Sequence, residues 1–149
     1  MLPLSCKTKL IIEMVYLTRK ERFNAAHKLW VDAWDDETNK AVFGKCANTN
    51  WHGHNYTLEV TVKGVPDPVL GFVIDAKKLS QIIQEEVIEL LDHKKLNLDV
   101  AFIPSNLQPT TENLVILIWK QLEPKIAGCK LHKIKLVETE TISAEYYGE

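Results

Sequence analysis

The sequence is poor in cysteine, glycine and proline, and it lacks any long apolar run. Among its 149 residues are three cysteines, six glycines and six prolines. Three widely spaced cysteines argue against a disulfide framework and fit a reducing compartment, so we expect a cytoplasmic protein. No stretch approaches the roughly 18 apolar residues of a membrane span or the apolar core of a signal peptide. We therefore expect neither secretion nor a membrane partner.

The chain also lacks a strong charge of either sign. Its formal net charge is -2, which gives no long-range attraction to nucleic acid, so phosphate groups must be recognised locally. With 46% hydrophobic residues, the chain can bury the core of one compact domain, which we assign to residues 14–149. Met14 directly precedes the first strand pattern. Residues 1–13 are therefore expected to be a disordered N-terminal extension or to mark an upstream start.

Alternating side chains predict several strands. Residues 52–62 and 132–139 alternate cleanly between apolar and polar side chains, which is typical of strands with one buried face. Residues 15–27 alternate too, but Arg19 and Glu21 interrupt the apolar face, which predicts a bend or a bulge. A further strand is expected at residues 143–147.

Two helices are predicted between these strands. Apolar residues recur at three- and four-residue spacing from Leu79 to Leu91, behind Asp75 as N-cap. A second helix should begin at Thr110 or Thr111 and stop before Pro124. The order strand, strand, helix, helix, strand indicates an α+β fold, with an antiparallel sheet and helices on one face.

Three histidines form the strongest chemical signal. Strand periodicity places His52 and His54 on one face, and Gly53 keeps a side chain off the other. His27, at the end of the neighbouring strand, is a candidate third ligand. Three neutral imidazoles leave a tetrahedral zinc with one open position, which is the arrangement of a catalytic site. The alternative is a set of hydrogen-bonded strand histidines without a metal.

Cys46 lies a few residues before His52 and has three interpretations. It is a fourth zinc ligand, an inert buried thiol, or a thiolate that acts as a base near a cation. Taken alone, the sequence slightly favours the ligand. Cys6 and Cys129 lack histidine neighbours and receive no role.

Three acidic residues have both functional and structural interpretations. Asp92 and His93 follow a helix, where they are a relay only if they meet Cys46 in space and otherwise a solvated helix end. Glu138 continues an apolar stripe, so it should pair either with a ligand edge bearing two N–H donors or with an internal Lys or Arg. Glu112 also fits a first-turn helix acid.

Five motifs occur in order from about residue 15 to the C-terminus. Together they closely resemble the 6-pyruvoyltetrahydropterin synthase and 6-carboxytetrahydropterin synthase family. The motifs are Phe23-Asn-Ala-Ala-His27, Cys46-x5-His52-Gly-His54-Asn-Tyr56, Leu91-Asp-His-Lys-Lys-Leu-Asn97, Pro109-Thr-Thr-Glu-Asn113 and Val137-Glu-Thr139.

The resemblance implies a tunnelling fold. In that fold a four-stranded antiparallel sheet is backed by two helices, and subunits assemble into a β-barrel. Three subunits would close the barrel, and two trimers would stack into a homohexamer. The active sites would then lie between subunits.

The resemblance also implies residue roles. Three imidazoles would bind zinc: His27, His52 and His54. Cys46 would be the proton-abstracting base, and Asp92 with His93 of a neighbouring chain would complete a relay to it. Glu138 would anchor the pterin ring, next to three further substrate-binding residues: Thr110, Thr111 and Glu112.

The implied substrate is 7,8-dihydroneopterin triphosphate, but the markers of the product are mixed. The gap from Cys46 to His52 and the segment 92–97 resemble the pyruvoyl-forming members, whereas segments 71–75 and 109–112 resemble the bacterial carboxy-forming members. We expect 6-carboxy-5,6,7,8-tetrahydropterin, formed with loss of triphosphate and acetaldehyde for queuosine biosynthesis. The alternatives are 6-pyruvoyltetrahydropterin, a hydroxymethyl pterin, and a non-catalytic module in which Cys46 closes a structural zinc site.

Overall fold

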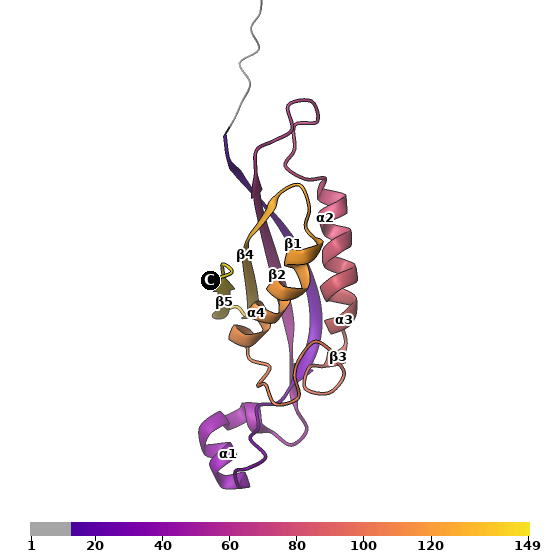
Figure 1. Ribbon diagram of the computed structural model, residues 1–149. Coiled ribbons are helices and arrows are strands. Elements are labelled where there is room, and N and C mark those ends of the chain that lie inside the picture. Colours follow the sequence, from indigo (N-terminus) through magenta and orange to yellow (C-terminus); the bar gives the residue numbers. More distant parts are fainter. Residues whose placement is uncertain (1–12) are drawn as a thin grey trace, which may run out of the picture.

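The centre of the molecule is a five-stranded sheet with helices across one face (Figure 1). The computed structural model describes residues 13–149, so the predicted extension lies, apart from Glu13, outside the described residues. The strands follow the order β3-β1-β2-β4-β5, and all neighbours are antiparallel except β3, which is parallel to β1. The strands are β1 (Val15–His27), β2 (His52–Gly64), β3 (Lys94–Lys95), β4 (Lys130–Thr139) and β5 (Ile142–Tyr146).

Two helical segments cover the sheet, as predicted, and a third helix stands at its end (Figure 1). Asp75 caps the first segment by accepting a hydrogen bond from the Lys77 amide, and Thr110 caps the second in the same way from Asn113. A π-helical turn interrupts the first segment. The helical elements are α1 (Asp36–Phe43), η1 (Gly44–Ala47), α2 (Ala76–Ile83), η2 (Gln84–Ile88), α3 (Glu89–Leu91), α4 (Thr111–Leu122) and η3 (Glu123–Lys125).

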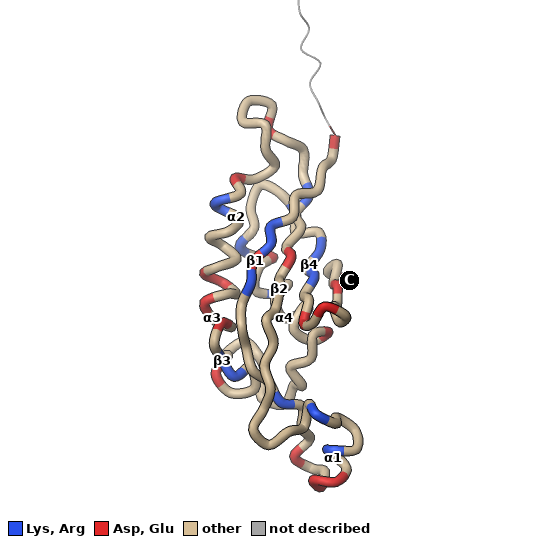
Figure 2. The backbone as a smooth tube through the Cα atoms, turned by 180° about the vertical axis from the view of Figure 1, so that it is seen from behind, with Lys and Arg blue, Asp and Glu red and all other residues tan. Residues whose placement is uncertain are grey.

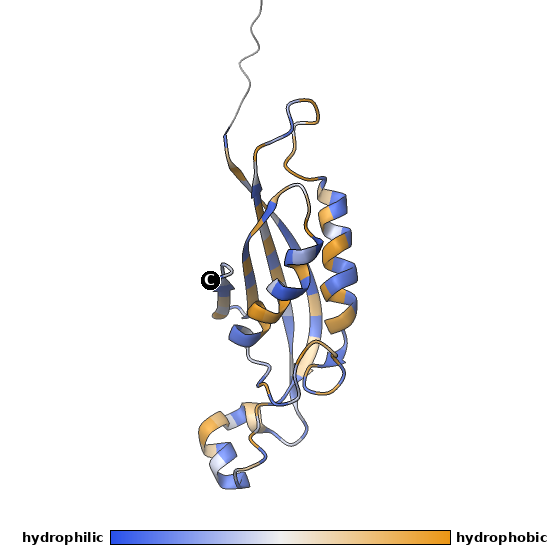
Figure 3. Ribbon diagram, viewed as in Figure 1, coloured by the Kyte–Doolittle hydropathy of each residue, from blue (hydrophilic) through white to orange (hydrophobic). Residues whose placement is uncertain are grey.

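The core lies between the sheet and its covering helices. Apolar and polar residues alternate along β2 and β4, and apolar residues recur along α2 and α4 (Figure 3). Leu58, Val60 and Leu136 of the sheet are fully buried, as are Leu79 and Ile118 of the helices. The predicted α+β class is therefore confirmed. None of the helices in residues 13–149 is long and apolar enough to cross a membrane.

The expectation of four strands was wrong by one. The amide of His93 donates to Asn24 O at 2.6 Å and that of Leu96 to Ala26 O at 2.8 Å, which brings β3 beside β1. A strand of two residues is too short to show alternation. The helix α1 was not predicted from the sequence either.

The predicted bulge in β1 is absent. Pairing with β2 runs without a shift from Val15 opposite Gly64 to His27 opposite His52. Arg19 and Glu21 stay on the helix-facing side because hydrogen bonds satisfy their polar groups there. Arg19 and the Ser80 hydroxyl both donate to Glu21 Oε1 at 2.7 Å, and Gln84 donates to Oε2 at 3.0 Å.

Charged residues of neighbouring strands pair on the opposite face of the sheet, and Figure 2 marks their positions along the backbone seen from behind. Lys20 pairs with Glu59 at 2.8 Å across β1 and β2. Glu145 of β5 forms ion pairs with two lysines of β4, Lys133 at 3.4 Å and Lys135 at 3.7 Å. A face with this many charges does not belong to the core of one chain.

We predict that Glu21→Gln lowers the free energy of unfolding by about 1–3 kcal/mol at neutral pH, since the amide disrupts a carboxylate held by three donors. Burial alone would raise the pKa of Glu21, but hydrogen bonds from Ser80 and Arg19 lower it below its ordinary value. The carboxylate therefore stabilises the fold above its unfolded pKa, and this contribution is lost as pH falls through the folded pKa.

Urea unfolding at neutral and at acidic pH measures the effect of Glu21→Gln. Glu85→Gln is the matched control, because Glu85 makes only an exposed contact with Gln81. Equal stability losses in the two variants, or a loss from Glu21→Gln that grows as pH falls, would contradict the prediction.

Candidate metal centre

The three predicted histidines meet at one end of the sheet. His27 ends β1 directly opposite His52, which begins β2, and His54 follows on the same face. One ring nitrogen from each lies within 4.8 Å of the others. A Cβ atom at Gly53 would lie 3.1 Å from Ala25 O, so the close pairing of β1 and β2 favours glycine at this position. The grouping predicted from strand periodicity is confirmed.

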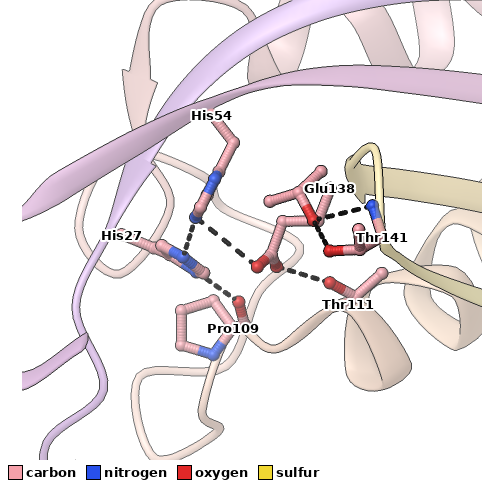
Figure 4. A network of polar contacts seen from close by, with 7 residues as sticks. His27, His54, Pro109, Thr111, Glu138 and Thr141 are labelled. Atoms are coloured by element: carbon pink, nitrogen blue, oxygen red, sulfur yellow. Dashed lines mark hydrogen bonds and ion pairs between the residues drawn. The ribbon is translucent and has the colours of Figure 1, made fainter. Parts of the chain in front are cut away.

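A backbone carbonyl orients His27 (Figure 4). Its Nδ1 lies 2.8 Å from Pro109 O, and because a carbonyl only accepts, Nδ1 must carry the proton. The Nε2 lone pair is then directed at the cluster, 3.1 Å from His54 Nε2. A histidine that ligates a metal typically donates its other N–H to such an acceptor.

His52 differs from the other two histidines, because it takes no part in a hydrogen-bonded set. Both its ring nitrogens are buried, and neither has a hydrogen-bond partner among the described residues. Burial lowers the pKa of His27, His52 and His54, which keeps the rings neutral, as metal ligands must be. An unpaired buried nitrogen and three neutral imidazoles fit a borderline cation such as zinc.

Glu138 faces the histidines from β4 (Figure 4). The β4–β5 pairing shifts between Val137 and Thr139, which leaves Glu138 unpaired in that ladder, while strand alternation keeps its side chain on the face of Ile134 and Leu136. Its Oε2 accepts from the Thr111 hydroxyl at 2.5 Å, and its Oε1 lies 3.5 Å from His54 Nε2. No Lys or Arg in residues 13–149 forms an ion pair with it, so the internal salt bridge is absent.

Tyr56 belongs to the same corner, and sequence reasoning treated it only as an apolar strand residue. It is 1% exposed and stacks on Phe23 with ring centroids 4.9 Å apart. Its hydroxyl has no hydrogen-bond partner within the described chain. Burial, Glu138 and Cys46 raise its pKa, so the hydroxyl keeps its proton. Its position two residues after His54 on the same strand face was the available signal.

Cys46 lies near the cluster but outside it. It sits in η1, half-buried, and its carbonyl accepts from the Leu29 amide at 2.9 Å. The close group of ligand atoms holds the three histidines and no sulfur. It is nevertheless close enough to Tyr56 to contribute to the raised pKa of that hydroxyl. This geometry favours a thiol beside the candidate metal centre over a fourth ligand.

Asp92 and His93 form a pair without reaching Cys46. His93 Nδ1 lies 2.8 Å from Asp92 Oδ2, and the Asn24 amide donates to Asp92 Oδ1 at 2.8 Å. This hydrogen bond from Asn24 outweighs burial and helps hold the pKa of Asp92 below its ordinary value. His93 is 76% exposed, with a left-handed backbone at φ 58°. The pair is presented outward, away from its own chain.

Two side-chain amides hold the segment that follows His27. Asn97 accepts from the Lys28 amide at 3.0 Å and donates to the Lys28 carbonyl at 2.7 Å. Gln108 does the same for Trp30, at 3.1 Å and 2.6 Å. Each amide replaces a strand partner, so the loop 97–109 fixes the exit of β1.

The other predicted substrate residues divide by environment. Thr111 is buried and contacts Glu138. The Thr110 hydroxyl is occupied in capping α4. Glu112 is an exposed acid in the first turn of that helix, and the described structure gives it no contact with the histidine group.

The chain is similar to proteins of one family. The sequence model of the 6-pyruvoyl tetrahydropterin synthase family matches residues 16–149. The 6-pyruvoyl tetrahydrobiopterin synthase of Dictyostelium discoideum is 42% identical over 135 residues, 91% of this chain and 97% of that protein. The Homo sapiens protein of that name is 38% identical over 133 residues, which are 89% of this chain and 91% of that protein. The structure of Caenorhabditis elegans 6-pyruvoyl tetrahydropterin synthase matches with a TM-score of 0.85 and 34% identity, over 93% of this chain and 98% of that one.

We predict that the chain binds one zinc ion and that His52→Ala abolishes binding, because it removes one of three ligands. With free zinc near 1,000 times its Kd, the metal should stabilise the fold by about 4 kcal/mol. Thermal unfolding with zinc and with a chelator, together with metal analysis, measures this. The control is His132→Ala, on a histidine outside the group. A chelator-sensitive melting temperature that survives in His52→Ala would refute the assignment.

Proposed function

Since the chain belongs to the 6-pyruvoyl tetrahydropterin synthase family, a family of lyases, we propose that it is a zinc-dependent enzyme acting on 7,8-dihydroneopterin triphosphate. The proposed products are 6-pyruvoyltetrahydropterin and triphosphate. The observation that carries this proposal is the buried corner in which three neutral imidazoles face Glu138, with Cys46 nearby.

The proposed product departs from the one favoured in the sequence analysis. The 6-carboxy product of queuosine biosynthesis was expected there, with the pyruvoyl product as its alternative. The relatives at 38–42% identity are named 6-pyruvoyl tetrahydrobiopterin synthases, and this supports the alternative. The pyruvoyl product is the substrate less triphosphoric acid, so it needs no external oxidant or reductant.

His27, His52 and His54 are the residues that would hold zinc. Bound there, zinc would supply Lewis-acid polarisation of substrate oxygens and acidify the adjoining C–H and O–H groups. The protein's own contribution is orientation: Pro109 O fixes the tautomer of His27, and the strand register fixes the other two rings. The site is therefore preorganised before substrate arrives.

Glu138 is the proposed anchor of the pterin ring. Its carboxylate has one strong donor, Thr111, and otherwise only the ring of His54 at 3.5 Å. An amino-pyrimidinone edge would present two N–H donors to it. This contact would orient the side chain of the pterin toward the histidines, and Thr110 and Glu112 stay proposed substrate-binding residues on the resemblance alone.

Cys46 is the proposed base that removes a proton from the substrate side chain. It lies outside the ligand group, so its sulfur is free for proton transfer. Asp92 and His93 are turned outward and do not reach Cys46 of their own chain. A relay from this pair to Cys46 therefore needs a neighbouring subunit, which supports an active site shared between chains.

Self-assembly accompanies this proposal. The sheet has open outer edges at β5 and along most of β1, and its uncovered face is charged rather than apolar. Edges of this kind favour pairing between copies of the chain into a closed barrel. We propose a homohexamer built from two trimers.

The competing function is a non-catalytic module with a closed structural zinc site. Cys46→Ala separates the two. We predict retained zinc, a folded oligomer and at least a hundredfold loss of turnover, in line with general-base contributions of about 10²–10⁴. Metal analysis, size-exclusion chromatography and turnover measure the three properties. Loss of zinc together with unfolding would establish the structural module instead, and Cys129→Ala is the control.

A second test identifies the product. Incubating the zinc-loaded protein with 7,8-dihydroneopterin triphosphate should release triphosphate and 6-pyruvoyltetrahydropterin, without acetaldehyde. Mass spectrometry of the pterin and an aldehyde assay measure the outcome. Stoichiometric acetaldehyde with a 6-carboxy pterin would instead indicate the carboxy branch.

A further inference from the structure

The hydroxyl of Tyr56 has no role in the chemistry described so far. It is buried, and no described residue offers it a hydrogen bond. An unpaired buried hydroxyl is unfavourable, whereas phenylalanine would keep the same ring packing without it. The adjacent strand already carries such a residue, Phe23, stacked on the same ring. A hydroxyl at this position therefore calls for a partner that arrives from elsewhere.

The surroundings of Tyr56 restrict where that partner lies. Its ring centroid is 5.6 Å from that of His54 and 6.4 Å from that of His27, both at steep interplanar angles. Glu138 and Cys46 also lie close to it, since both contribute to its raised pKa. The hydroxyl is thus enclosed by the groups that the proposed function uses.

None of these neighbours satisfies the hydroxyl. Glu138 directs one carboxylate oxygen to the Thr111 hydroxyl and the other toward His54. The nitrogens of His27 face Pro109 O and His54. A partner for the hydroxyl must therefore come from outside the described residues, and a ligand held by Glu138 beside the imidazoles would bring an oxygen to this corner.

We infer that the Tyr56 hydroxyl binds the substrate, donating a hydrogen bond to a side-chain oxygen of the bound dihydropterin. The inference rests on the proposed function and adds a residue to it. Glu138 would hold the ring edge, and Tyr56 would hold the side chain between Cys46 and the imidazoles. A neutral phenol supplies a donor without adding a charge beside the cation.

The test compares two ligands and three proteins. Fluorescence titration of the zinc-loaded protein gives the dissociation constants of both ligands. The first is 7,8-dihydroneopterin, which keeps the side-chain hydroxyls, and the second is 7,8-dihydropterin, which lacks the side chain. Tyr56→Phe should weaken the binding of dihydroneopterin about 5- to 100-fold and leave the binding of dihydropterin unchanged. Tyr147→Phe, which loses only an exposed contact with Glu145, should change neither.

A structural role for the hydroxyl predicts a different pattern. The melting temperature of Tyr56→Phe without ligand should equal or exceed that of the wild type, since no contact is lost. Equal weakening of both ligands with a lower melting temperature, or unchanged binding of both, would overturn the inference and leave the proposed function standing. A wild type that binds neither ligand would overturn both.

Discussion

The register between β1 and β2 is the constraint on which the site depends. The two strands pair over 13 residues without interruption, so His27 lies opposite His52 and diagonal to His54. A slip of one residue would turn one strand's imidazoles to the charged face of the sheet. The buried apolar residues of both strands oppose such a slip, because it would expose them too. The packing of the core thus also fixes the positions of the three histidines of the candidate metal centre.

Sequence periodicity predicted much of this arrangement, because strands with one buried face repeat every two residues. It gave the four antiparallel strands, both covering helices and the shared face of the histidines. It could not give β3, whose pairing depends on hydrogen bonds from His93 and Leu96 to a strand far away in the chain. It also could not decide whether Glu138 pairs with a Lys or Arg of its own chain, since that depends on side chains from separate elements.

Two carboxylates on the helix-facing side of the sheet illustrate this limit. Glu21 and Glu138 both interrupt apolar stripes, and both look like defects in the sequence. Glu21 accepts three hydrogen bonds from its own chain, whereas Glu138 accepts one and faces an imidazole. The first is a satisfied structural group. The second has acceptor capacity left for a ligand, and only the tertiary contacts distinguish them.

The carbonyl of Pro109 holds the ring of His27, and the amides of Asn97 and Gln108 hold the segment that follows it. These contacts come from residues that are synthesised some 70 to 80 residues after His27. All three imidazoles leave the ribosome well before these residues do. A nascent chain that has exposed only its N-terminal hairpin can display the histidines but cannot fix the ring of His27. The ring of His27 is therefore fixed only when nearly the whole polypeptide is available, so the complete ligand set of the proposed zinc enzyme forms near the end of translation.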